Sequence, residues 1–180
     1  MKLRDLIKMN HMNDGTRTLS ESIAILEVLQ AMMDWKRETG AVGVLIGGCA
    51  VSYYAKPRGT TDIDFIFLSD ADIPREVKGF KRTRPGAFQH ELTHVEVEVV
   101  TPAAINISEK LVKTVIDTAE NVDGMMIASP SGLVALKLQR LKRYDEGDII
   151  ALLETGNVNL NGWPVTPEQL NKLEEIRKKL

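Results

Sequence analysis

Apolar residues follow two different periods along the chain, and the change of period separates a part rich in strands from a part rich in helices. Short apolar or alternating runs at residues 42–46, 62–68 and 95–100 are typical of β-strands. Residues 108–120, 131–143 and 145–154 have apolar side chains at the spacing of amphipathic helices, with a brief strand at 125–128. The pattern therefore predicts strands first and helices later.

Capping signals mark a helix near each end of the chain. Thr18 to Glu21 fits a capping box before residues 23–38, and Gly40 is placed to end that helix. Thr166 and Gln169 form a second capping box before the last helix, whose apolar stripe is narrow. We expect this last helix to dock on the body of the protein, with contact to a partner chain as the alternative.

Length and composition indicate one soluble globular domain. We expect residues 1–180 to form it, with a core over about 18–102 and a helical lobe over about 103–180. The sequence has no apolar stretch typical of a signal peptide or a membrane span, so we expect a cytoplasmic protein without a membrane partner. The single cysteine, Cys49, excludes an internal disulfide and a zinc cluster built on cysteines.

The net charge of −2 argues against extensive binding of duplex nucleic acid. A local basic set still suits an anionic acceptor such as RNA, although a solvated loop explains it equally well. Its members are Lys78, Lys81, Arg82 and Arg84.

Two aspartates stand on alternate positions of an apolar strand, DIDFIFL, where the side chains of Asp62 and Asp64 point to the same face. Buried carboxylates are costly, so the pair needs a cation or a solvent-filled cleft; solvated acids on a half-exposed strand are the alternative. The strand at 95–100 carries Glu96 and Glu98 on one face, and either can add a third carboxylate. Three such groups suit Mg²⁺ or Mn²⁺.

Gly47 and Gly48 lie at the turn between an apolar strand and a short helix predicted over 50–55. Glycines allow a phosphate to approach the backbone, and a helix N-terminus offers free N–H groups to an anion. Close packing of the helix against the strand would select the same glycines, so this pair is ambiguous by itself.

The run VLIGGCAVSYYAKPRGTTDIDFIF resembles the active-site signature of the nucleotidyltransferase superfamily. Its R-x-T-x-D-x-D form is similar to the AbiEii-like toxin branch, with Arg58, Thr60, Asp62 and Asp64 in those places. In VEVVTP, Glu98 rather than Glu96 matches the third carboxylate of this branch.

The segment ASPSGLVALKLQRLKRYDEGDIIALLETG resembles the helical segment of the same family, in which a lysine, a basic residue and D-x-x-D face the nucleotide. The matching residues are Lys137, Arg143, Asp145 and Asp148. This likeness and the two motifs above together span about residues 42–156.

The resemblance implies an α/β fold, with a mixed sheet flanked by helices and a C-terminal helical lobe. It also implies Mg²⁺- or Mn²⁺-dependent transfer of an NMP from an NTP to a hydroxyl acceptor, such as an RNA end (that of a tRNA, for example), a protein or a small molecule. Asp62, Asp64 and Glu98 would be catalytic and hold metal. The nucleotide-binding residues would be Gly47, Gly48, Arg58, Thr60, Lys137, Arg143 and Asp148. Membership in a toxin–antitoxin system, with an antitoxin as partner, follows from the same resemblance.

Two alternatives belong to other functional classes. The first is a non-catalytic module of the same fold that binds a nucleotide or a partner protein. The second is a zinc metalloprotease, because His90, Glu91 and His94 form an H-E-x-x-H match. Strand-like residues follow His94 at once and Pro85-Gly86 precedes closely, so we interpret the segment as a hairpin. Its histidines would then line the cleft or lie on a strand surface.

Overall fold

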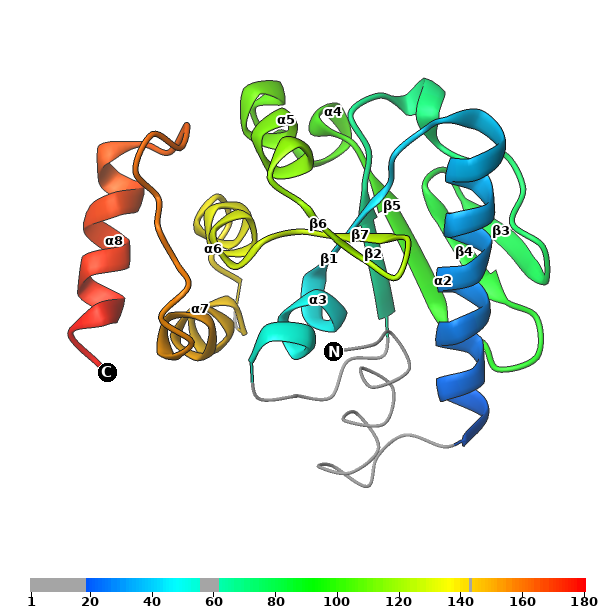
Figure 1. The fold of residues 1–180 in the computed structure, drawn as a ribbon, viewed down its shortest axis with the longest axis horizontal. Coiled ribbons are helices and arrows are strands. Elements are labelled where there is room, and N and C mark those ends of the chain that lie inside the picture. Colours follow the sequence, from blue (N-terminus) through cyan, green and yellow to red (C-terminus); the bar gives the residue numbers. More distant parts are fainter. Residues whose placement is uncertain (1–18, 56–61, 143) are drawn as a thin grey trace.

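The computed structural model describes residues 19–55, 62–142 and 144–180, and these residues form a mixed α/β fold around one sheet (Figure 1). The sheet has seven strands in the order β3-β4-β5-β2-β1-β7-β6. Their bounds are β1 Val44–Ile46, β2 Asp62–Ile66, β3 Phe80–Arg84, β4 Ala87–His90, β5 Glu96–Val100, β6 Glu120–Val122 and β7 Met125–Ile127. The predicted fold class, a mixed sheet flanked by helices, is confirmed.

The helices lie on both sides of this sheet. Figure 1 shows α2 in front of β4, and α2 also contacts β7 towards the opposite edge of the sheet. Helices α6, α7 and α8 lie together away from α2, with α8 outermost (Figure 1). Their bounds are α2 Leu19–Thr39, α3 Gly47–Tyr54, α4 Pro102–Ile105, α5 Glu109–Asp117, α6 Pro130–Leu138, α7 Asp145–Glu154 and α8 Pro167–Arg177. Within the described ranges, no helix combines the length and apolar character needed to cross a membrane.

The centre of the sheet is the parallel pair of β2 and β5, with β1 antiparallel to β2 on the other side. One face of this pair is apolar, and Ile63, Phe65, Val97 and Val99 are at most 3% exposed there. These side chains join one hydrophobic cluster with residues of α2, α5 and α6. The core therefore fixes the two strands that carry the predicted carboxylates.

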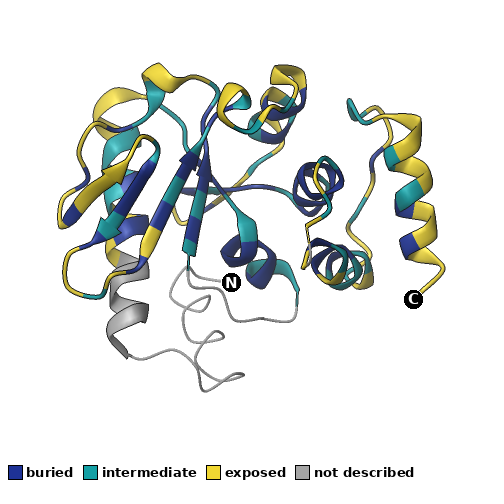
Figure 2. Cartoon of the chain, turned by 180° about the vertical axis from the view of Figure 1, so that it is seen from behind, coloured by how far each residue is buried: buried dark blue, intermediate teal, exposed yellow. Residues whose placement is uncertain are grey.

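Two edge strands, β3 and β6, are missing from the sequence prediction, which gave residues 69–86 as a short helix and a loop. The structure has a short 3₁₀-helix at Asp70–Asp72, followed by strand β3. Four of the five β3 side chains are exposed, so this strand has no apolar alternation to reveal it (Figure 2). Polar edge strands of this kind avoid pairing with other chains.

The H-E-x-x-H segment forms the connection between β4 and β5, as the hairpin interpretation predicts. His90 ends β4, and His94 adopts a left-handed conformation with φ 59°. The His90 ring lies 2.6 Å from the Glu27 carboxylate through Nε2 and 2.8 Å from the Thr93 hydroxyl through Nδ1. Because the zinc protease interpretation needs both histidines on one helix, it is wrong for this chain.

The last helix docks on the body of the protein. The predicted capping box is present: the Thr166 hydroxyl accepts from the Gln169 N–H at 3.2 Å, and the Gln169 side chain accepts from the Thr166 N–H at 2.8 Å. Leu173 and Ile176 are buried, and α8 packs against α6 and α7. The described residues thus confirm docking, and Leu170 lies at its exposed margin.

Candidate active site

The predicted carboxylates lie side by side on one face of the sheet. In the parallel pair, Asp62 is opposite Glu96 and Asp64 is opposite Glu98. Glu98 is partly buried and lines the same pocket as Asp64, whereas Glu96 is exposed. Parallel strands in register bring these side chains together because residues directly opposite each other project to the same face.

A pocket of about 160 Å³ lies against Asp64 and Glu98. Gly47 and Ile46 bound it at the end of β1, and helix α6 closes it with Leu133 and Leu136. Its remaining walls are apolar and cationic: Val100, Ile105, Ile107, Lys137, Arg140 and Lys142. Charges act more strongly in such a partly desolvated space than in water.

Asp64 is the most perturbed acid of the site. The pKa of its carboxyl group is raised from 3.8 to about 6, first by burial and then by the neighbouring Asp62 and Glu98 carboxylates, while Arg140 and Lys137 act in the opposite direction. A buried carboxylate beside other carboxylates is stabilised either by binding a proton or by a nearby cation. This is the electrostatic situation that a metal ion or a cationic partner relieves.

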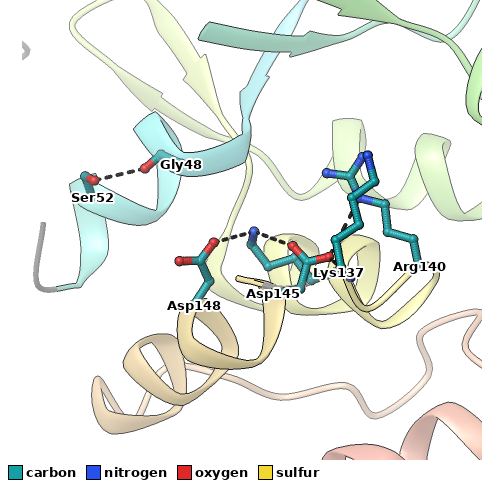
Figure 3. Close-up of polar contacts among 7 residues, drawn as sticks. Gly48, Ser52, Lys137, Arg140, Asp145 and Asp148 are labelled. Atoms are coloured by element: carbon teal, nitrogen blue, oxygen red, sulfur yellow. Dashed lines mark hydrogen bonds and ion pairs between the residues drawn. The ribbon is translucent and has the colours of Figure 1, made fainter. Parts of the chain in front are cut away.

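Gly47 makes the close approach of Asp64 possible. Helix α3 begins at Gly47, earlier than the predicted start at residue 50, so the glycine pair forms its first turn. Gly47 has φ +68°, and a Cβ at this position would overlap the Asp64 carboxylate. Gly48 is buried, and its carbonyl accepts a hydrogen bond from Ser52 at 2.9 Å (Figure 3).

Lys137 does not present a free charge to the pocket. The residue is 5% exposed, and Nζ donates to Asp145 at 3.1 Å and to Asp148 at 2.6 Å (Figure 3). The Asp145 carboxylate also accepts from the Lys142 N–H at 2.6 Å. This buried triad ties the end of α6 to the start of α7 and carries one net negative charge, since two aspartates face one lysine.

Arg140 is a site residue that the sequence analysis missed. It follows Lys137 by three positions, just past the end of α6, and its exposed side chain lines the pocket. Its Nε lies 3.8 Å from Asp145, beside the triad (Figure 3). The signal in the sequence was the three-residue spacing from Lys137, because the helix was predicted to run on to residue 143 and this spacing would place both side chains on one side of it.

Glu98 has a cationic partner from the edge of the sheet. Arg84 of β3 forms a hydrogen-bonded ion pair with the Glu98 carboxylate, and both side chains are partly exposed. Among the residues that the structure describes, no group of three or more His, Cys, Asp or Glu side chains is placed to hold a metal ion. Asp64 and Glu98 are nevertheless adjacent hard-oxygen donors with mutual repulsion, so the donor set fits a divalent cation once Glu98 leaves Arg84.

Several predicted residues fall elsewhere or outside the described part. Arg58, Thr60 and Arg143 lie outside the described residues. Asp148 is buried at Lys137 rather than at the carboxylates. His90 is in register with Phe80 and packs against its ring, on the face opposite the acids.

Comparison with solved structures gives a match over most of the chain. The crystal structure of an antigenic nucleotidyltransferase-like protein from Paracoccidioides brasiliensis superposes with a TM-score of 0.55, covering 84% of this chain and 86% of that chain at 17% identity. This chain has a nucleotidyltransferase-like fold. A scan of protein-family models gives no match for the chain, and neither does a search of curated proteins. An identity of 17% establishes the shared fold, and the chemistry has to come from the residues of the pocket.

Replacing Gly47 by alanine should destabilise the protein more than the same change at Gly40. Both glycines have positive φ, which costs alanine about 1–2 kcal/mol, but only at Gly47 would the new Cβ meet Asp64. We expect urea unfolding to show a loss of about 1–2 kcal/mol for Gly40→Ala and a clearly larger loss for Gly47→Ala. Equal losses would mean that the approach of Asp64 to Gly47 is not tight.

The raised pKa of Asp64 predicts a pH-dependent stability. Between 3.8 and about 6 the folded protein binds more protons than the unfolded chain, so the free energy of unfolding falls as pH rises through this range. In metal-free buffer, Asp64→Asn should therefore gain stability over the wild type between about pH 4 and pH 7, by up to about 3 kcal/mol. Thermal unfolding across this range measures the difference, and a constant difference would contradict the assignment.

Proposed function

We propose that this protein is a metal-dependent nucleotidyltransferase, which transfers an NMP from an NTP to a hydroxyl acceptor. The observation that carries the proposal is the adjacent pair of Asp64 and Glu98, packed over Gly47 in a pocket with Arg140 on its wall. The shared fold supports the general class. Acids on one side and cations on the other suit a substrate that combines a metal ion with phosphates.

The carboxylates would hold Mg²⁺ or Mn²⁺, with Asp64 and Glu98 as nearest ligands and Asp62 one position along the same face. When bound, such an ion would neutralise charge on the α-phosphate and align the attacking and leaving oxygens. Burial of Asp64 supports this role, because a desolvated carboxylate gains more from a cation than a solvated one does.

The cations of the pocket would bind the triphosphate. Arg140 and Lys142 both line the pocket, and their link to Asp145 anchors this segment to the buried triad. Lys137 would act indirectly, by fixing the junction of α6 and α7, in place of the direct phosphate contact that the resemblance implies. A guanidinium group such as Arg140 matches phosphate oxygens with two parallel N–H donors.

In the transfer step, the acceptor oxygen would form a bond to the α-phosphorus as the bond from that phosphorus to the bridging oxygen of pyrophosphate breaks. The acceptor proton would pass to a carboxylate of the site, and pyrophosphate would leave with the bonding electrons. The products are then the NMP-modified acceptor and pyrophosphate, which balances the reaction.

A non-catalytic nucleotide-binding module is the second candidate. Three ion pairs favour it: Glu98 is paired with Arg84, and Lys137 is paired with both Asp145 and Asp148. Calorimetry and acceptor labelling together separate the two candidates. Mg²⁺-dependent NTP binding by calorimetry, without labelling of any acceptor, would favour the non-catalytic module.

Incubation with α-labelled NTPs, Mg²⁺ and cell extract should label an acceptor. Asp64→Asn should abolish the labelling, because the variant removes a charged ligand while keeping the size of the side chain.

Arg140→Ala should raise the KM for the NTP by about tenfold or more, because the variant loses a charge-assisted hydrogen bond to the triphosphate. Arg37→Ala is the matched control, because Arg37 is an exposed arginine of α2 that pairs with Asp34.

Equal labelling by Asp64→Asn and the wild type would refute the catalytic assignment. The resemblance to a toxin branch extends the proposal to cells: expression of the wild type should slow growth, and Asp64→Asn should relieve the effect. Growth that is unaffected by the wild type would remove the toxin role and leave the transferase proposal standing.

Metal binding has a readout that is independent of activity. Mn²⁺ should raise the melting temperature of the wild type, and the rise should be lost in Asp64→Asn and reduced in Glu98→Gln. Glu96→Gln is the matched control, since Glu96 lies on the same strand and face but is exposed and outside the pocket. An equal rise in all three variants would place the metal elsewhere.

A further inference from the structure

The carboxylate face of the sheet continues across the hairpin to the edge strand β3. The strand registers define two rows of neighbouring side chains that cross the sheet from edge to centre. The first row consists of Arg84, Ala87, Glu98 and Asp64. The second row consists of Lys81, Gln89, Glu96 and Asp62. Each row therefore begins with a cation at the edge and ends with an acid at the centre.

The basic residues of β3 are divided between the two faces. Arg82 is in register with Phe88, and its guanidinium lies over the Phe88 ring at 5.8 Å. Phe88 is in register with Val97, whose side chain is buried on the apolar face. Of the predicted basic set, the register thus places Lys81 and Arg84 on the carboxylate face and Arg82 on the other.

Both cations on the carboxylate face are available to a ligand. Lys81 is exposed and has no ion-pair partner within the described ranges. Arg84 is paired with Glu98 in a contact that is partly exposed on both sides, and exposed pairs of this kind contribute little to stability. An anion that reaches this face can compete with Glu98 for the Arg84 guanidinium.

The acids therefore lie between two cationic sets. Arg140 and Lys142 are on the pocket side of Asp64, and Lys81 and Arg84 are on the hairpin side. The pocket side is the one assigned above to the NTP. An acceptor that has to reach the α-phosphate then approaches from the hairpin side, where its own negative charge would meet Lys81 and Arg84.

We propose that Lys81 and Arg84 form an acceptor subsite, which binds a phosphate group of a phosphate-bearing hydroxyl acceptor. The inference rests on the proposed function, because it takes the carboxylate row as the place of transfer. Guanidinium and ammonium groups on the same face of a strand suit a phosphate better than a neutral hydroxyl compound. Two sources share this chemistry: the backbone of a single-stranded nucleic acid and a small phosphomonoester.

Direct binding tests the subsite without any turnover. The probes are a fluorescent single-stranded oligoribonucleotide of about ten nucleotides, followed by anisotropy, and glycerol 3-phosphate, followed by phosphorus NMR. A peptide nucleic acid of the same base sequence, which lacks phosphates, is the neutral control. Lys81→Ala and Arg84→Ala should each weaken binding of at least one probe by about tenfold. For the oligonucleotide, each variant should also reduce the slope of log K against log salt concentration by about one.

Arg82→Ala is the matched control, because it removes an exposed arginine from the same strand but from the opposite face. It should leave binding unchanged, and Arg84→Lys should retain part of it. If only oligonucleotide binding depends on Lys81 and Arg84, the acceptor is a nucleic acid. If glycerol 3-phosphate binding depends on these residues, the acceptor is a small phosphomonoester. Equal losses in Arg82→Ala and Lys81→Ala, or no salt-dependent binding of either probe, would overturn the subsite.

Failure of this inference and failure of the proposed function give different results. If binding depends on Lys81 and Arg84 but no acceptor is ever labelled, a phosphate-binding site at Lys81 and Arg84 stands and the transferase activity is wrong. If the Lys81→Ala and Arg84→Ala proteins label their acceptor with wild-type KM and kcat, the subsite is wrong and the transferase activity stands.

Discussion

The rest of the site depends on the burial of the Asp64 carboxylate beside Glu98 and against Gly47. Two acids at neighbouring positions of parallel strands repel each other, and burial deprives Asp64 of much of its hydration. The apolar side of the same strands, with Phe65 and Val99, fixes the pair in the core. The backbone cannot move away to relieve the repulsion, so the relief has to come from positive charge.

The structure supplies that charge from two separate parts of the chain. Arg84 reaches Glu98 from the edge strand, while Arg140 and Lys137 act on Asp64 from the end of α6. Lys137 is itself neutralised by Asp145 and Asp148, which makes it a structural centre that holds α6 to α7. Cationic side chains on two sides of the acids suit a reaction between two anionic substrates, which would enter from different sides.

The sequence predicted the elements with strong periodicity and failed where the period is weak. Helix α7 was predicted with its observed bounds, Asp145–Glu154, and the acids of β2 and β5 were placed on one face by alternation alone. Strand β3 was missed because an exposed edge has no apolar face to mark it. The pairing of Lys137 was missed because a lysine on an amphipathic helix looks the same whether it faces solvent or two aspartates.

The sequence by itself determined the order of the strongly periodic elements, the cap of the last helix and the placement of Asp62 and Asp64 on one face of a strand, because these depend on periods of a few residues. The capping box predicted at Thr18 lies outside the described residues. The resemblance already favoured Glu98 over Glu96, but only the tertiary structure decided that Glu98 shares a pocket with Asp64 and that Arg140 lines it. Strand register also placed Lys81 and Arg84 on the carboxylate face and Arg82 on the other. These facts depend on contacts between residues far apart in the chain, and no local pattern records such contacts.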